Sequence, residues 1–144
     1  MTSIEETKVM TVNETENAHV LVAEDDQAFR ELLCFTLFRA GYTVTSCADG
    51  LTLLERLEEH LQGKEDRFDL VISDVRMPAL TGLEVLEALH DQPRRPPLIC
   101  MTAFGDPATH AMARDLGATA TLDKPFAIEC LLEEVAAICR RKVH

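Results

Sequence analysis

Short apolar runs alternate with longer amphipathic segments along most of this chain. Residues 70–72 form an apolar run that is too short for a helix and shows no polar alternation, which is typical of a strand buried on both faces of a parallel sheet. Pro78 prevents this strand from continuing, so Asp74 lies at its carboxyl end. Comparable runs predict strands at residues 20–23, 42–47, 70–74, 98–101 and 118–122.

Between these strands, apolar residues recur with the period of an α-helix. Asp26, Asp49 and Thr81 are suitable N-cap residues, and Glu84 completes a capping box with Thr81. We therefore predict helices from Asp26 to Gly41, Asp49 to Leu61, Thr81 to about His90, Asp106 to Gly117, and about Phe126 to Arg140. The predicted inward faces comprise Phe29, Leu32, Leu33, Leu37 and Ala40 in the first helix, Leu51, Leu54, Leu57 and Leu61 in the second, and Ile128, Leu131, Leu132, Val135 and Ile138 in the last.

Strands that alternate with helices in this way predict an α/β fold. We expect a doubly wound, five-stranded parallel sheet with right-handed crossovers and helices on both faces. At 144 residues the chain is long enough for one domain with its own core. Residues 1–18 are polar and acidic without a periodic apolar face, so we expect a disordered tail there.

Composition and charge argue against several classes of function. Although 47% of the residues are hydrophobic, no apolar run is long enough for a transmembrane helix, and the first residues lack the pattern of a secretory signal. We therefore expect a cytoplasmic protein without membrane contact. The formal net charge of −11 argues against direct nucleic-acid binding, because phosphate backbones attract clusters of Lys and Arg. The basic run at 140–142 lies where cations favour the end of a helix.

Five cysteines are scattered along the chain and form no C-x-x-C motif: Cys34, Cys47, Cys100, Cys130 and Cys139. An odd number of scattered thiols favours free, buried cysteines in a reducing compartment. We therefore expect neither a disulfide framework nor a zinc site.

Polar residues stand at the carboxyl ends of four predicted strands. Glu24 and Asp25 come after the first strand, Asp74 ends the third, Thr102 follows the fourth, and Lys124 follows the fifth. Each alone has an ordinary explanation as a helix cap, a turn hydroxyl or a solvated loop charge. In a doubly wound sheet, however, these ends converge on one crevice, so the side chains are expected to share a site. Carboxylates this close repel one another unless a cation joins them, and a hard cation such as Mg²⁺ suits oxygen ligands.

Four short motifs make the chain resemble a response-regulator receiver domain of two-component signalling, of the CheY-like kind. The motifs are Val-Ala-Glu-Asp-Asp at 22–26, Ser-Asp-Val-Arg-Met-Pro at 73–78 with Gly82 after it, Met-Thr-Ala at 101–103, and Asp-Lys-Pro-Phe at 123–126. The resemblance covers residues 19–141 and leaves 142–144 as a short tail. It implies a flavodoxin-like (βα)5 three-layer sandwich with strand order 2-1-3-4-5.

The resemblance also implies a role for each residue at the strand ends. Asp74 would be the phosphoacceptor, and the phosphoryl donor would be a sensor histidine kinase or a phosphotransfer protein. The remaining roles are Mg²⁺ (or Mn²⁺) binding by Asp25, Asp74 and the Arg76 carbonyl, with Glu24 acting largely through water, and phosphoryl contacts from Thr102, Lys124 and the backbone N–H groups near Val75 and Ala103. The chain would thus be a signalling switch that assists only its own phosphorylation and dephosphorylation, and not an enzyme in the usual sense.

By the same resemblance, residues 106–141 would form the face that binds a downstream protein or a second copy of the chain after phosphorylation. We expect no DNA-binding or catalytic output domain in this chain. It would be a stand-alone receiver, a phosphorelay intermediate or a fragment of a longer protein.

The chain departs from the family pattern at Thr121. Receivers usually carry an aromatic ring three residues before the Lys, and this ring turns inward when the Thr moves. A Thr side chain is short and stiff in a strand, so we expect no ring-rotation readout. The loop from Thr102 to Asp106 and the following helix would carry the signal instead. The alternatives are that a nearby ring such as Phe104 substitutes, or that the coupling is simply weak.

Three other classes of function are compatible with an α/β fold of this kind. A flavodoxin-like FMN protein shares the topology, but the acidic residues 24–26 would repel a phosphate. A hydrolase of the haloacid dehalogenase type usually has a D-x-D-x-T motif at its first strand, which is absent. A phosphorylation-independent interaction module of the same fold remains as an alternative.

Overall fold

Five parallel strands form one sheet in the order β2-β1-β3-β4-β5, as predicted. The computed structural model describes residues 18–64, 67–103 and 107–143. The strands are β1 (His19–Ala23), β2 (Thr43–Cys47), β3 (Leu70–Asp74), β4 (Leu98–Ala103) and β5 (Ala120–Lys124). β3 lies in the middle of the sheet, and β2 and β5 are its edges.

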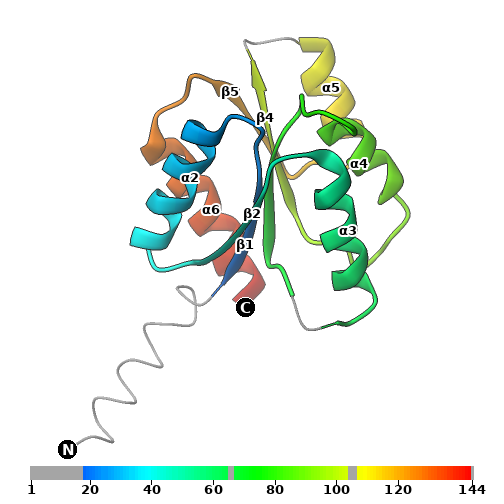
Figure 1. Cartoon of the computed structure of the whole chain (residues 1–144), viewed down its shortest axis with the longest axis horizontal. Helices are drawn as coiled ribbons and strands as arrows, with labels where there is room; N and C mark the ends of the chain where they lie inside the picture. Colours follow the sequence, from blue (N-terminus) through cyan, green and yellow to red (C-terminus); the bar gives the residue numbers. More distant parts are fainter. Residues whose placement is uncertain (1–17, 65–66, 104–106, 144) are drawn as a thin grey trace, which may run out of the picture.

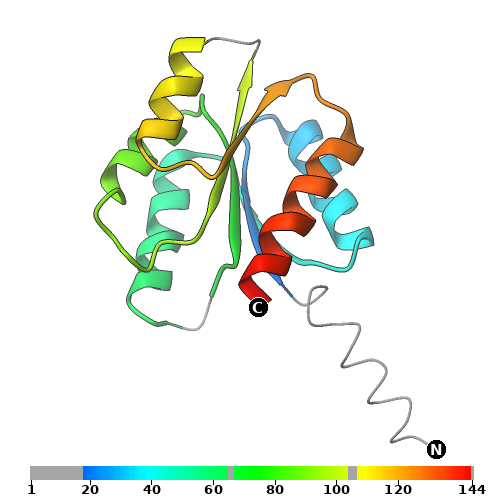
Figure 2. The same cartoon turned by 180° about the vertical axis from the view of Figure 1, so that it is seen from behind.

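Helices cover both faces of the sheet, which confirms the doubly wound architecture. In the described part of the chain they are α2 (Gln27–Arg39), α3 (Gly50–Leu61), α4 (Gly82–Ala88), α5 (Pro107–Asp115) and α6 (Ile128–Val143). α2 and α6 lie on one side of the sheet, and α3, α4 and α5 lie on the other (Figures 1 and 2). None of these helices is long and apolar enough to cross a lipid bilayer.

The sheet separates two apolar cores. Leu33 and Leu37 of α2 pack with α6 and one face of the sheet, whereas Leu53 and Leu57 of α3 pack with α4 and the other face. Every residue of β3 is buried, because helices cover this strand from both sides. This two-sided burial explains why residues 70–72 of the strand are apolar without alternation.

Three helices begin at the predicted cap residues. The Asp26 carboxylate accepts the Phe29 N–H, and the Asp49 carboxylate accepts the Thr52 N–H. Thr81 and Glu84 form the expected capping box at the start of α4. The predicted helix start at Asp106 lies outside the described residues, as do residues 1–17 of the predicted tail.

Two boundaries differ from the prediction. β5 begins at Ala120 and ends with Lys124, two residues later than predicted, because the Ala118 N–H still closes the end of α5 by donating to Ala113. Lys124 is therefore the last residue of the strand and not part of the loop. Ala18, predicted to lie in the tail, is buried, and its carbonyl accepts the Thr43 N–H.

Three of the residues predicted to face inward are exposed: Leu32, Ala40 and Leu51. Consecutive helical positions differ by about 100° around the axis, so a Leu next to an inward position lies well off the buried face. In α3 the inward positions are Leu53 and Leu57, which lie four residues apart. Leu53 was missing from the predicted face.

The structure records no disulfide at any of the five cysteines, and they are not all buried, although buried thiols were predicted. Cys47, Cys100 and Cys139 are buried, Cys34 is half-buried and Cys130 is exposed. Burial raises the pKa of Cys47 to about 11 and the pKa of Cys100 to about 12. These two thiols are therefore protonated at neutral pH and chemically inert.

Two glycines allow helices to approach the loop that follows β3. A Cβ on Gly50 would overlap the Leu80 carbonyl, and a Cβ on Gly82 would lie 2.6 Å from the Asp74 carbonyl oxygen. The Gly82 N–H also donates to the Val75 carbonyl at 2.9 Å. Both helix starts are thus packed against the backbone that presents Asp74.

We predict that Gly50→Ala destabilises the protein strongly. The added methyl group meets backbone that cannot move independently, so the free energy of unfolding should fall by at least about 3 kcal/mol. Urea denaturation measures the loss. The control is Gly63→Ala, where φ is +76° but no atom lies within 4 Å of the new Cβ. It should cost about 1 kcal/mol, and equal losses in the two variants would contradict the close approach at Gly50.

Candidate functional site

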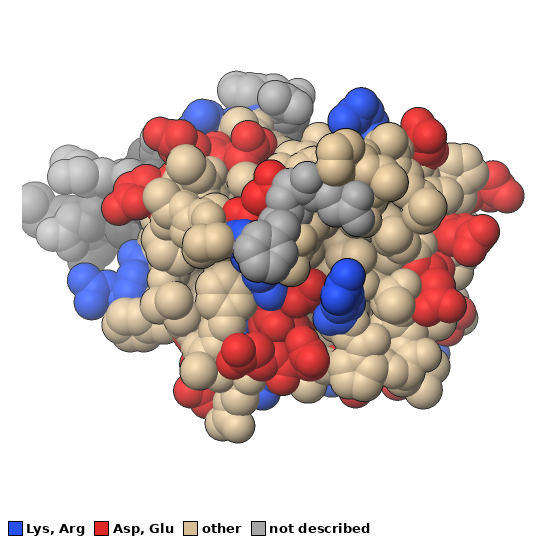
Figure 3. Space-filling model, turned by 90° about the horizontal axis from the view of Figure 1, so that it is seen from above, with Lys and Arg blue, Asp and Glu red and all other residues tan. Residues whose placement is uncertain are grey.

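The register of β1 and β3 brings three carboxylates together. Ala23 pairs with Ser73, so Glu24 and Asp74 come next on neighbouring strands. One carboxylate oxygen from each of Glu24, Asp25 and Asp74 lies within 4.8 Å of the others. Viewed onto the carboxyl ends of the strands, acidic side chains gather near the middle of this face beside basic ones (Figure 3).

The three carboxylates differ in their surroundings. Glu24 is only 1% exposed and Asp74 only 8%, whereas Asp25 is exposed. Glu24 is held in place by the Asp26 N–H, which donates to its Oε2 at 3.1 Å. Burial raises the pKa of Glu24 more than its hydrogen bonds lower it. Positive charge close to Glu24 favours its ionised form and offsets part of this effect of burial.

Lys124 supplies this positive charge from the far edge of the sheet. Its Nζ donates to Asp74 Oδ2 at 2.6 Å and to Glu24 Oε1 at 2.8 Å. Burial alone would lower the pKa of Lys124, but the two carboxylates outweigh it and raise this pKa. The ammonium group also lies 4.8 Å from the centre of the Phe29 ring, a favourable cation–π distance.

The second oxygen of Asp74 faces the backbone of the next loop. The Arg76 N–H donates to Asp74 Oδ1 at 2.9 Å. The Val75 N–H, which was expected to contact a phosphoryl group, instead donates to the Met101 carbonyl at 2.9 Å and extends the pairing of β3 with β4. In this structure the donor that faces the carboxylate is the N–H of Arg76, the residue after Val75.

Thr102 lies at the strand end as predicted, but its hydroxyl does not donate to Asp74. It donates to Asp123 Oδ1 at 2.8 Å, on the neighbouring strand β5. Asp123 is also 2.6 Å from His110 Nε2, and His110 Nδ1 is 2.8 Å from the Thr121 hydroxyl. The hydrogen bonds from Thr102 and then His110 lower the pKa of Asp123.

Sequence reasoning assigned no role to His110 or Asp123. Asp123 does belong to the Asp-Lys-Pro-Phe motif, but nothing in the motif shows which neighbour its side chain meets. His110 lies in the first turn of α5, near the carboxyl end of β4, and that position was its one available signal. Phe104, weighed as a substitute ring near Thr121, lies outside the described residues.

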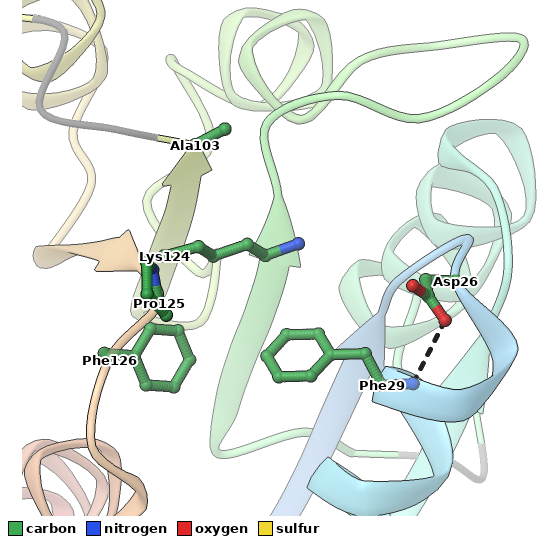
Figure 4. Close-up of a pocket in the computed structure, with 6 residues that line it drawn as sticks. All are labelled: Asp26, Phe29, Ala103, Lys124, Pro125 and Phe126. Atoms are coloured by element: carbon green, nitrogen blue, oxygen red, sulfur yellow. Dashed lines mark hydrogen bonds between the residues drawn. The ribbon is translucent and has the colours of Figure 1, made fainter.

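A pocket of about 410 Å³ opens beside Lys124. It is lined by Asp26, Phe29, Ala103, Lys124, Pro125 and Phe126. Figure 4 shows Lys124 reaching toward the end of β3, with the rings of Phe29 and Phe126 facing each other across the pocket. The two rings meet edge to face with centroids 5.9 Å apart. Phe29, predicted to be a core residue of the first helix, thus forms part of a pocket wall.

The donor set fits a hard divalent cation. In the part of the chain that the structure describes, Glu24, Asp25 and Asp74 are the group of side chains close enough to share a metal ion. All their donors are carboxylate oxygens, and Asp25 is open to solvent. Mg²⁺ prefers such ligands and commonly keeps several water molecules while using one or two carboxylates.

The chain is similar in sequence to a known protein family and to named members of it. Residues 20–136 match the family model described as the response regulator receiver domain. The chain is 38% identical over 125 residues to "Response regulator MprA" of Mycobacterium ulcerans, covering 87% of this chain and 51% of that protein. It is 35% identical over 127 residues to "Transcriptional regulatory protein FixJ" of Bradyrhizobium diazoefficiens, covering 88% and 59%. The chain thus spans little more than half the length of these relatives.

Two solved structures with the same fold match this chain over nearly their whole length. The chemotaxis response regulator CheY4 of Vibrio cholerae superposes with a TM-score of 0.74 at 34% identity, covering 85% of this chain and 98% of that one. The receiver domain of the Francisella response regulator 1452 gives a TM-score of 0.79 at 26% identity, covering 88% and 99%. These likenesses confirm the predicted flavodoxin-like fold.

We predict that Lys124→Ala destabilises the protein when divalent cations are removed with a chelator. The change leaves Glu24 buried without its cation, so the free energy of unfolding should fall by about 2 kcal/mol at neutral pH. Without Lys124 the pKa of Glu24 rises further, and the folded state then binds a proton more tightly than the unfolded state. The deficit should therefore shrink as the pH falls toward about 5.

Urea denaturation at several pH values tests this prediction. Lys64→Ala is a matched control, since it removes the same charge from an exposed position outside the site. Its stability should stay within about 0.5 kcal/mol of the parent. A deficit in Lys124→Ala that does not depend on pH would argue against the ion pair with Glu24.

Proposed function

The chain belongs to the response regulator receiver domain family, and from this premise we propose that it is a phosphorylation-dependent signalling switch with Asp74 as its phosphoacceptor. The observation that carries the proposal is the contact of Lys124 Nζ with Asp74 Oδ2 at 2.6 Å. A carboxylate held at a strand end by a cation, with one further N–H from Arg76, is positioned to react with an electrophilic phosphorus.

The chemistry requires positioning and charge neutralisation more than covalent assistance. An oxygen of Asp74 forms a bond to phosphorus while the bond from phosphorus to the donor's imidazole nitrogen breaks, and the electron pair of that bond stays on the nitrogen. Lys124, the Thr102 hydroxyl and the N–H groups of Arg76 and Ala103 would contact the phosphoryl oxygens. The product is an acyl phosphate, which water hydrolyses, so the modification is temporary.

Mg²⁺, or Mn²⁺ in its place, is part of this proposal. Asp25, Asp74 and the Arg76 carbonyl would hold the cation, with Glu24 acting through water. When bound, the cation supplies positive charge that neutralises the phosphoryl oxygens. The fit rests on the all-oxygen donor set of three adjacent carboxylates.

The proposed donor is a sensor histidine kinase or a phosphotransfer protein. The proposed output surface comprises α5, β5 and α6, where a downstream protein or a second copy of the chain would bind after phosphorylation. Direct nucleic-acid binding by this chain remains disfavoured by its net charge of −11. A cytoplasmic location without membrane contact is part of the same proposal.

A phosphorylation-independent interaction module of this fold is the alternative function. It would need neither a reactive carboxylate nor its helpers. The close arrangement of Asp74, Lys124 and Glu24 favours the switch, because burying these charges without a chemical use costs stability. The match to the receiver-domain family model disfavours both an FMN-binding protein and a hydrolase of the haloacid dehalogenase type.

We predict that Asp74→Asn abolishes phosphorylation. With Mg²⁺ and a small phosphodonor such as acetyl phosphate, the parent protein should gain one acid-stable, base-labile phosphoryl group. An amide is a far weaker nucleophile than a carboxylate, so the variant should gain essentially none. Intact-mass spectrometry measures the gain. Asp91→Asn, an exposed position away from the site, is the matched control and should behave as the parent. Full phosphorylation of Asp74→Asn would disprove the assignment.

We also predict that Asp25→Asn weakens Mg²⁺ binding by at least about tenfold, because it replaces an inner ligand by a poorer one. Isothermal titration calorimetry gives the affinity. Asp26→Asn removes the same charge from the next residue and keeps a good N-cap for α2, so it should change the affinity by about twofold at most. Similar losses in both variants would mean that net charge, and not coordination by Asp25, determines the affinity.

A further inference from the structure

The imidazole of His110 connects α5 to two strands of the sheet. Its Nδ1 lies 2.8 Å from the Thr121 hydroxyl, and its Nε2 lies 2.6 Å from Asp123 Oδ1 and 3.4 Å from the Thr102 hydroxyl. The side chain is only 21% exposed. α5 begins at the carboxyl-end edge of the sheet, beside β4 and β5 (Figure 2).

For a neutral His110 ring, the chemistry of these groups gives the direction of each hydrogen bond. A carboxylate can only accept, so Asp123 receives hydrogen bonds from both the Thr102 hydroxyl and His110 Nε2–H. In the neutral ring Nδ1 then accepts the hydroxyl hydrogen of Thr121. The four side chains form one continuous chain of hydrogen bonds in which every donor is used.

This network of hydrogen bonds engages the hydroxyl group of Thr102. A Thr hydroxyl has one hydrogen to donate, and in this structure it goes to Asp123. A phosphoryl group on Asp74 would need the same hydrogen. A phosphoryl group on Asp74 and the Asp123 carboxylate therefore compete for the hydrogen bond from Thr102. When Asp123 loses this hydrogen bond, its interaction with His110 changes as well.

The position of the ring matters as much as its hydrogen bonds. Thr121 occupies the place where the family usually has an aromatic side chain, and it cannot reach across to Thr102 by itself. His110 brings a ring to this place from α5 and contacts both threonines. A change at Thr102 thus reaches α5 through side chains that already touch.

We propose that Asp123 and His110 are positioning residues: Asp123 holds Thr102 in its unphosphorylated orientation, and His110 transmits the departure of Thr102 to α5. This inference rests on the proposed function, because it requires a phosphoryl group or its mimic at Asp74. In this proposal the ring of His110 on α5 takes the part of the aromatic ring that the family usually has at the position of Thr121 on β5.

The test uses beryllofluoride, a phosphoryl mimic, with Mg²⁺ and nuclear magnetic resonance of the full chain labelled in its backbone amides and histidine rings. In the parent protein, beryllofluoride should shift both ring nitrogens of His110 and the amides of α5. The His90 ring, which lies 3.4 Å from the Leu116 carbonyl at the opposite end of α5, should not respond. A silent His110 ring in a protein that binds the mimic would overturn the proposal.

Variants separate transmission from binding. His110→Leu should bind beryllofluoride within about threefold of the parent but lose the response of α5, whereas His110→Gln, which can still donate and accept, should keep most of it. His90→Leu is the matched control and should respond as the parent does. An undiminished α5 response in a folded His110→Leu protein would overturn the proposal.

The restraint on Thr102 is tested by affinity. Asp123→Ala frees the hydroxyl, so beryllofluoride should bind at least about threefold more tightly than in Asp26→Asn, which removes the same charge from the same edge. This gain should vanish when Thr102→Val is added, because the freed group is then absent. A gain that persists with Thr102→Val would contradict the restraint. Failure of the parent to bind beryllofluoride at all would overturn the proposed function, and this inference with it.

Discussion

Repulsion between like charges is the constraint around which this site is built. The pairing of β1 with β3 forces Glu24 and Asp74 to be neighbours, and Asp25 adds a third carboxylate. Such a group is stable only if positive charge is close to it. Lys124 meets this need by spanning from β5 to both buried carboxylates, so one ammonium group links the edge of the sheet to its centre.

The same constraint explains why the surrounding contacts are so specific. The Asp26 N–H fixes one oxygen of Glu24, and the Arg76 N–H fixes one oxygen of Asp74. The remaining oxygens of these two residues receive Lys124. Each buried oxygen therefore has a donor, which is the condition under which buried charge is tolerated. The exposed Asp25 needs no such partner and stays available for a ligand from solvent.

Much of the fold could be predicted because its causes are local. Two-sided burial explains the apolar run at residues 70–72 of β3, and the caps at Asp26, Asp49 and Thr81 mark the helix starts. The placement of Lys124 inside β5 was missed, because Ala118 was predicted to begin the strand but instead hydrogen-bonds to Ala113 at the end of α5. The convergence of Glu24, Asp74 and Lys124 followed from the topology alone. The engagement of Val75 with Met101, and of Thr102 with Asp123 and His110, depends on which neighbour a group faces across a strand boundary, and no sequence pattern records that.

The order of the strands gives the site a mechanical asymmetry. Asp74 stands on β3, which is bonded to a strand on each side, so any displacement of this strand disrupts two ladders of hydrogen bonds. Lys124, Asp123 and Thr121 stand on β5, which has β4 as its single neighbour. The proposed reaction would therefore take place on the stiffest part of the sheet, and the groups proposed to respond to it stand on the more easily displaced edge strand. A small displacement of β5 would change the outer surface of the protein without disturbing β3, which carries Asp74.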